Sequence, residues 1–313
     1  MKKFFATAII FCLTLMLGSL KSSAAEFELV SYSAQVKLQW LATTGDPDAQ
    51  RILKELGKVN IYSNKNLPDY ERMEKVNSIY QELCHETTVE YVRKHNYKNI
   101  MDIGGGYSPR AVLFAKEGRK YYGAELAAVA VAASNIMDKI LDKNSRANVY
   151  CDEVLVEDKD AFMAAAGTFD GKICMVEQGL MIYLNQDRLA QYYENIRDVL
   201  KKHGGCFITS DMVTRPLFKD IVAALYGDSQ VELLYAETKD MYEELFDSLI
   251  NEENFDYQLE AVEYAEQELG LKVEKVQLLS DTSKLNCMKD LTPEQRKKIE
   301  EICKKNYLWV VTY

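Results

Sequence analysis

The chain has 313 residues, of which 48% are hydrophobic and 27% are charged, a composition typical of folded globular proteins. Its formal net charge of −10 argues against the phosphate backbone of a nucleic acid as the main partner, because no basic cluster offsets that charge. A chain of this length can bury the core of one large α/β domain that carries a cap.

Residues 1–25 have the three-part layout of a secretory signal peptide. Two lysines precede an apolar run over residues 4–20, and small residues follow at 23–25. The apolar run is short for a helix that spans a membrane. The alternatives are an uncleaved anchor or a true start at Met16. The layout favours a separate segment that directs export.

The cysteines point to the opposite location. Of the seven cysteines only Cys12 lies in the N-terminal segment, and Cys151, Cys174 and Cys206 fall in or beside predicted strands. A thiol in such a place behaves as a small buried hydrophobe, and reduced core thiols are typical of a cytoplasmic enzyme. No metal site is predicted, because there is no CxxC or HExxH spacing and the three histidines are isolated.

Apolar residues recur at helical spacing from Glu26 to about His95, which predicts an N-terminal helical cap over residues 26–97. Residues 46–48 form a capping break between two of these helices. Residues 70–97 are predicted as one amphipathic helix. Because these helices precede the first predicted strand, we expect them to form a lid or flank.

From residue 98 onward, predicted strands and helices alternate. The predicted strands cover residues 99–103, 120–126, 148–151, 172–177 and 206–211, and the helices between them cover 110–118, 127–143, a stretch that ends at 166, and 186–202. This alternation predicts right-handed crossovers and a doubly wound, mostly parallel sheet covered on both faces. Such α/β folds bind ligands at the carboxyl ends of their strands.

The C-terminal part adds an acidic helical insertion over residues 215–268, which we expect to cap the sheet and shape a substrate pocket. Three elements are predicted after it, a strand at 272–279, a helix at 293–306 that begins after Thr292, and an edge strand at 308–313. The predicted organisation is therefore a Rossmann-like α/β domain over residues 98–313 with N-terminal and inserted helical caps.

The turn after the first predicted strand carries the main functional signal. Asp102 ends that strand, and the glycine run Gly104, Gly105 and Gly106 follows it before a predicted helix. Glycines let the backbone approach a ligand closely, and a helix start offers free N–H groups. Glu125 ends the next predicted strand, where a carboxylate can accept two hydrogen bonds from the vicinal hydroxyls of a ribose. The sequence therefore predicts an adenosine-type cofactor.

The charge of Asp102 distinguishes between two such cofactors. It would repel the pyrophosphate of a dinucleotide, whose site also expects a third small residue for close helix packing. An acid here suits a cationic group such as the α-ammonium of S-adenosylmethionine, and Arg110 would then pair with the carboxylate of that ligand. The alternative is that Asp102 is an ordinary acid at a helix N-terminus and Arg110 a surface charge.

Three stretches, residues 30–34, 102–110 and 178–184, resemble the leucine carboxyl methyltransferase family, which includes polyketide O-methyltransferases. The resemblance covers roughly residues 29–211. It implies a class I methyltransferase fold with S-adenosylmethionine as the methyl donor. By this resemblance Asp102 and the glycines hold the methionine part of the donor and Arg110 its carboxylate. Glu125 would hold the ribose, and Asp152, just after the third predicted strand, the adenine amino group.

The sequence departs from the family pattern at two places. Ser108 and Pro109 replace an Asp-Thr pair before the arginine, and Gln178 stands where the family mostly has glutamate. Neutral glutamine can form hydrogen bonds but cannot act as a base, and the adjacent Glu177 is expected to take part of that role. Tyr183 is expected to point at the transferred methyl group or the acceptor, with a packed core tyrosine as the alternative.

Together these features predict an S-adenosylmethionine-dependent methyltransferase that methylates an oxygen of a small molecule or a carboxylate, with Gln178 and Tyr183 in the catalytic group. No clear general base is found, which mildly favours an ionised acceptor. Asp211, predicted to end the fifth strand, is expected to face the substrate or to cap the next helix. The alternatives are a non-catalytic exported binding protein on the same fold and an NAD-dependent oxidoreductase, which Asp102 disfavours.

Overall fold

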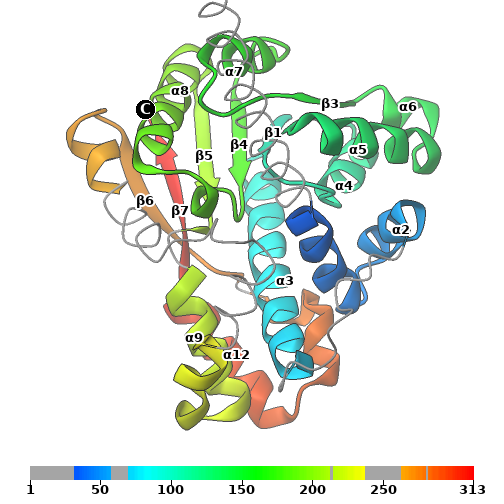
Figure 1. Cartoon of the computed structure of the whole chain (residues 1–313), viewed down its shortest axis with the longest axis vertical. Helices are drawn as coiled ribbons and strands as arrows, with labels where there is room; N and C mark the ends of the chain where they lie inside the picture. Colours follow the sequence, from blue (N-terminus) through cyan, green and yellow to red (C-terminus); the bar gives the residue numbers. More distant parts are fainter. Residues whose placement is uncertain (1–31, 58–69, 212–213, 237–261, 280) are drawn as a thin grey trace, which may run out of the picture.

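In the part of the chain that the structure describes, seven strands form one sheet in the order β3-β2-β1-β4-β5-β7-β6 (Figure 1). The computed structural model describes residues 32–57, 70–211, 214–236, 262–279 and 281–313. The predicted signal segment and residues 237–261 of the predicted insertion lie outside the described residues.

The strands that form this sheet are β1 Asn99–Ile103, β2 Lys120–Glu125, β3 Val149–Glu153, β4 Ile173–Glu177, β5 Gly205–Thr209, β6 Lys272–Gln277 and β7 Tyr307–Thr312. Strands β1 to β5 run parallel, whereas β7 is antiparallel to both β5 and β6. The prediction of a doubly wound, mostly parallel sheet is confirmed. The prediction that the last strand lies at the edge is wrong, because β7 lies between β5 and β6.

Helices cover both faces of the sheet (Figure 1). They are a helix over residues 32–43, α2 Pro47–Leu56, α3 Tyr70–Lys94, α4 Arg110–Lys116, α5 Ala127–Ile140, α6 Lys143–Arg146, α7 Lys159–Ala166, α8 Gln186–His203, α9 Thr214–Tyr226, α12 Pro293–Lys305, and short helices over residues 231–236 and 262–267. Alternate strand residues enter different cores: Ile100 packs with α3, α4 and α5, and Met101 packs with α7 and α8.

Local sequence explains where several of these helices begin. Asp46 caps α2, with its Oδ1 2.6 Å from the N–H of Ala49, and Pro47 follows as the first helical residue. Thr292 and Gln295 form a capping box at the start of α12, which also begins with a proline. The predicted start of the last helix is therefore confirmed.

Helix α3 differs from the amphipathic helix that the sequence predicts, because it is buried on most sides. Buried polar residues lie along it, among them Asn77, Glu82 and His85. The carboxylate of Glu82 accepts hydrogen bonds from the backbone N–H of Asn286 at 2.7 Å and of Cys287 at 2.8 Å. Helix α9 and the C-terminal 3₁₀ turn that contains these two residues pack against α3, so the face with polar residues is covered as well.

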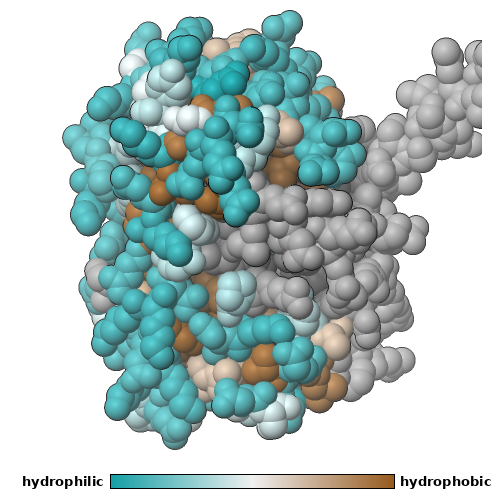
Figure 2. Space-filling view, turned by 90° about the vertical axis from the view of Figure 1, so that its left-hand side faces the viewer, coloured by the Kyte–Doolittle hydropathy of each residue, from teal (hydrophilic) through white to brown (hydrophobic). Residues whose placement is uncertain are grey.

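Strand β6 forms one edge of the sheet and is charged. It exposes Lys272, Glu274 and Lys275, and the ammonium of Lys275 lies 4.3 Å from the ring centroid of Tyr307. Charged residues on an edge strand discourage pairing with another chain. Figure 2 shows that the described part of this side of the molecule is largely hydrophilic. None of the described helices combines the length and apolar character needed to cross a membrane.

Candidate cofactor-binding site

Three of the predicted acidic residues meet at the carboxyl edge of the sheet. The strand order reverses between β1 and β4, and ligands of doubly wound folds bind at such a reversal. Asp102 lies at the end of β1, Glu125 ends the neighbouring β2, and Glu177 ends β4, where it pairs in register with Ile103. Figure 1 shows the ends of β4 and β5 directed towards the half of the molecule that contains α9 and α12.

Close neighbours leave no room for a Cβ at two positions of the glycine run. A Cβ at Gly105 would lie 2.4 Å from the carboxylate of Asp102, and a Cβ at Gly106 would lie 2.6 Å from that of Ala34 in helix 32–43. Gly104 and Gly106 also have φ values of 60° and 66°, in the left-handed region that favours glycine. The turn is therefore held tightly between the first strand and the N-terminal helix.

Asp102 and Arg110 form a buried bidentate ion pair. Nε of Arg110 lies 2.7 Å from Oδ2 of Asp102, and Nη2 lies 3.0 Å from Oδ1. The side chains are 0% and 3% exposed, and the hydroxyl of Tyr121 donates to the same carboxylate at 2.9 Å. Arg110 is thus not a surface charge. In this arrangement the two charges neutralise one another. Direct contact of either side chain with a ligand stays a prediction.

Gln178 connects this ion pair to α3. Its Oε1 accepts a hydrogen bond from Nη1 of Arg110 at 3.0 Å, and its Nε2 donates to Oε1 of Gln81 at 2.7 Å. A glutamate at this position could accept the first bond but could not donate the second. The amide of Gln178 thereby pairs with Arg110 on one side and with Gln81 on the other.

The side chain of Glu177 contacts the loop that follows β4. Its carboxyl oxygens accept hydrogen bonds from the N–H of Leu180 at 2.6 Å and from the hydroxyl of Thr209 at 2.5 Å. Burial and the neighbouring Asp211 carboxylate raise the pKa of Glu177 well above its usual value. Glu177 therefore stabilises the loop through these hydrogen bonds, and it lines neither of the two cavities at this edge of the sheet.

Asp211 also stabilises this loop, and it does not end a strand as the sequence suggested. Strand β5 ends at Thr209. The carboxylate of Asp211 accepts hydrogen bonds from the backbone N–H groups of Gly179, Leu180 and Met181, the last two at 2.9 Å. It thereby caps the 3₁₀ turn Met181–Tyr183 instead.

Lys37 is a site residue that the sequence analysis missed. It lies on helix 32–43, and its Nζ donates to the carbonyl oxygens of Gln178 at 3.1 Å and Gly179 at 2.7 Å. Burial lowers the pKa of Lys37, whereas the charges of Asp211 and Glu177 act in the opposite direction. A helical pattern does not show which lysine folds over a sheet edge. The sequence feature that could have pointed to Lys37 is its position close to residues 30–34.

A cavity opens at this edge of the sheet, and a smaller one lies behind the glycine turn. Among the predicted site residues the larger cavity is lined by Gly104, Glu125 and Tyr183, together with Lys37 and the segment 154–157. The smaller cavity is lined by Gly105, Arg110 and Gln178, together with Gln81 and His85. Asp102, Gly106, Asp152 and Glu177 line neither of these two cavities.

Asp152 lies within β3 and not just after it, as the sequence analysis placed it. Its exposed side chain is a hydrogen-bond partner of Tyr122, and residues 154–157 line the cavity beyond the end of that strand. Contact between Asp152 and an adenine stays a prediction. The apolar side chains of Val154 and Val156 offer a second place for a ring to pack.

Tyr183 and Glu125 differ in what they can do at neutral pH. Burial raises the pKa of Tyr183 to about 12, and Ser33 is its hydrogen-bond partner, so its hydroxyl stays neutral. Burial raises the pKa of Glu125 to about 8, although its Oε1 accepts a hydrogen bond from the N–H of Gly106 at 2.5 Å. Tyr183 is therefore a neutral hydrogen-bonding group, and Glu125 is a carboxyl that a ligand can ionise.

Strands β3-β2-β1-β4-β5 run parallel, and the antiparallel strand β7 lies between β5 and β6. This strand order is the class I methyltransferase fold. No protein-family model and no curated protein sequence matches the chain. Solved structures with a similar fold include three methyltransferases. The methyltransferase domain of bacterial CtHen1 is 14% identical with a TM-score of 0.45, and the match covers 75% of this chain and 100% of that one.

The other two similar structures were solved with the methyl donor. The glycopeptide N-methyltransferase MtfA, complexed with S-adenosyl-L-methionine, is 14% identical with a TM-score of 0.34, covering 54% of this chain and 63% of that one. The magnesium protoporphyrin IX methyltransferase ChlM from Synechocystis PCC 6803, with bound S-adenosylmethionine, is 11% identical with a TM-score of 0.35, covering 56% and 74%. The likeness is one of fold.

Proposed function

We propose that this chain binds S-adenosylmethionine at the carboxyl edge of the sheet and transfers its methyl group to an oxygen of a small molecule or a carboxylate. The observation that carries the proposal is the cavity at the strand reversal, whose wall combines Gly104, the carboxyl of Glu125 and the ammonium of Lys37. The resemblance of three sequence stretches to the leucine carboxyl methyltransferase family supports the same conclusion.

The residues on the cavity wall suit the parts of this cofactor. Glu125 is held in place by the N–H of Gly106 and can accept hydrogen bonds from the two ribose hydroxyls. Arg110 is bound to Asp102, so Lys37 is the better placed cation for the carboxylate of the methionine part. The apolar residues of segment 154–157 can pack against the adenine.

When bound, the cofactor supplies a methyl group that is already activated by a sulfonium. The chain then contributes alignment and exclusion of water, as the buried loop after β4 and the apolar cavity wall allow. The neutral hydroxyl of Tyr183 can hold the acceptor oxygen by a hydrogen bond. An acceptor that is already an anion needs no general base.

The helices before β1 belong to this proposal as a cap over residues 26–97. Helix 32–43 contributes Ser33, Ala34 and Lys37 to the cavity wall. We extend the same role to the insertion over residues 215–268, which would shape the acceptor pocket beside the Rossmann-like domain.

Titration calorimetry with S-adenosylhomocysteine and residues 26–313 tests the cofactor. The protein is expected to bind it, and Glu125→Ala is expected to weaken binding by about 1–3 kcal/mol, the cost of a lost charge-assisted partner. Asp102→Ala is expected to weaken binding as well, because Arg110 would lose the carboxylate that holds it beside the glycine turn. Glu153→Ala is the matched control, because Glu153 is an exposed carboxylate at the end of β3 outside the cavity.

Absence of both binding heat and a thermal shift would contradict the cofactor assignment. Unchanged affinity in both variants, with folding verified by circular dichroism, would place the pocket elsewhere. Methyl transfer itself is then measured with candidate acids and phenols as acceptors.

The same binding is expected to depend on pH through Glu125. Its pKa in the folded chain is about 8 against a usual value of 4.5, so the folded state keeps a proton between these values that the unfolded state releases. The stability contributed by this group is complete below pH 4.5 and is lost as the pH rises through 8. The ribose hydroxyls of a bound ligand would donate hydrogen bonds to Glu125 and so favour its ionised form.

Affinity for S-adenosylhomocysteine should therefore increase by up to about tenfold per pH unit from pH 6 to 8 and then level off. Calorimetry in buffers of different ionisation enthalpy should show proton release on binding at pH 7. The Glu125→Gln variant should show neither effect. A wild-type affinity independent of pH over this range would contradict the assignment of Glu125.

A further inference from the structure

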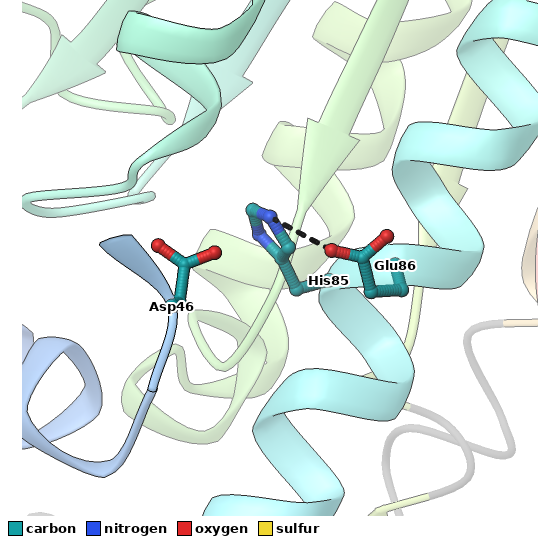
Figure 3. A group of neighbouring side chains, drawn as sticks. All are labelled: Asp46, His85 and Glu86. Atoms are coloured by element: carbon teal, nitrogen blue, oxygen red, sulfur yellow. Dashed lines mark ion pairs between the residues drawn. The ribbon is translucent and has the colours of Figure 1, made fainter. Parts of the chain in front are cut away.

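A second cluster of ligand-type side chains lies where the N-terminal helices meet α3. It consists of Asp46, His85 and Glu86 (Figure 3). Asp46 directly precedes α2, whereas His85 and Glu86 are neighbours on α3. One donor atom from each residue lies within 4.8 Å of the others, and Figure 3 shows the imidazole ring between the two carboxylates.

The imidazole of His85 is buried without a hydrogen bond. The residue is 4% exposed, and among the described residues no hydrogen bond reaches either of its ring nitrogens. Its Nε2 lies 3.9 Å from Oε1 of Glu86, which is too long for a hydrogen bond. The described chain thus leaves both ring nitrogens without a hydrogen bond, and the residue lines the smaller cavity.

The two carboxylates also lack a cationic partner. Within the described chain, neither Asp46 nor Glu86 lies within 4.0 Å of a lysine or arginine nitrogen, the ion-pair distance. Asp46 uses Oδ1 to cap α2, which leaves Oδ2 available. The nearby buried Glu82 differs, because two backbone N–H groups satisfy its carboxylate. Asp46 and Glu86 therefore present carboxyl oxygens to a buried imidazole.

We propose that Asp46, His85 and Glu86 bind a divalent first-row transition-metal ion of the Zn²⁺ type. One imidazole nitrogen and two carboxylate oxygens are a donor set that such ions accept, whereas Mg²⁺ and Ca²⁺ prefer oxygen alone. Donors at about 2.1 Å from a tetrahedral ion lie about 3.4 Å apart, so donor atoms that now lie within 4.8 Å of one another need to close by up to about 1.4 Å. Water completes the coordination.

Such an ion would join the start of α2 to the middle of α3. His85 also lines the smaller cavity beside Arg110 and Gln178, so the ion would hold the N-terminal helices against the wall of the cofactor site. The sequence analysis predicted no metal, because the ligands come from a loop and a helix that are far apart in the chain. The cluster does not depend on the proposed methyl transfer.

The test is calorimetric titration of ZnCl₂ into the chelator-treated chain, with thermal unfolding as a second readout. One ion is expected to bind per chain and to raise Tm, with MgCl₂ binding at least about tenfold more weakly. His85→Gln, Glu86→Gln and Asp46→Asn are each expected to weaken Zn²⁺ binding at least about tenfold.

His95→Gln is the matched control, since His95 follows α3 and stacks on Tyr91 at 4.2 Å outside the cluster. It should bind Zn²⁺ as the wild type does. If His85→Gln fails to fold, Asp46→Asn decides, because asparagine caps a helix as well as aspartate does. Absence of stoichiometric Zn²⁺ binding, or binding that none of the three variants weakens, would overturn the proposal.

Discussion

Replacing Arg110 by alanine is expected to lower the free energy of unfolding by about 3–5 kcal/mol, the usual cost of removing one partner of a buried ion pair. The carboxylate of Asp102 is 0% exposed and, among the described residues, would keep the hydroxyl of Tyr121 as its hydrogen-bond partner. Gln178 would lose its contact with the guanidinium at the same time. Urea unfolding followed by circular dichroism measures the change.

Arg93→Ala is the matched control for this experiment. Arg93 pairs with Glu117 at 2.6 Å, but its side chain is 46% exposed, so its loss should cost no more than about 1 kcal/mol. The double variant Asp102→Leu with Arg110→Met should be more stable than Arg110→Ala, because it leaves no unpaired charge. Equal effects of Arg110→Ala and Arg93→Ala would show that the buried pair has no special role.

The strand ends are the part of the site that the sequence predicts well. The central parallel strands are short and buried, and the carboxyl ends of parallel strands share one edge of the sheet. The position of Asp102 close to Glu125 at that edge therefore follows from the strand assignment alone. The order of the last two strands does not, because β7 has one buried and one half-buried face, and a short apolar run suits an inner strand as well as an edge strand.

Contacts between distant segments are the part that the sequence does not predict. The sequence treats Asp102 and Arg110 as separate partners for a ligand, but the start of α4 brings the guanidinium onto the carboxylate. Lys37 and His85 lie on helices whose local pattern gives no sign of the neighbours they meet. These positions depend on how the N-terminal helices pack on the sheet edge, which helical periodicity does not encode.

Replacing Asp211 by asparagine is expected to disrupt the loop after β4. The carboxylate accepts three backbone hydrogen bonds, from Gly179, Leu180 and Met181. Asparagine has one acceptor oxygen, and its NH₂ group would face backbone donors instead. One or two buried N–H groups would lose their partner at about 1–3 kcal/mol each, so we expect unfolding to become easier by about 2–4 kcal/mol. Urea unfolding measures this change.

Binding should change in the same variant, because the loop supplies Gly179, Leu180 and Tyr183 to the wall of the larger cavity. Affinity for S-adenosylhomocysteine is expected to fall at least about tenfold in the folded variant, which corresponds to the loss of one good hydrogen bond. Asp142→Asn is the matched control, since Asp142 also accepts two backbone N–H bonds but in an exposed cap. It should leave both properties unchanged, because asparagine is an equal cap and water reaches the site. If Asp211→Asn were as harmless as Asp142→Asn, the loop would owe its shape to Glu177 and Lys37 and not to the aspartate.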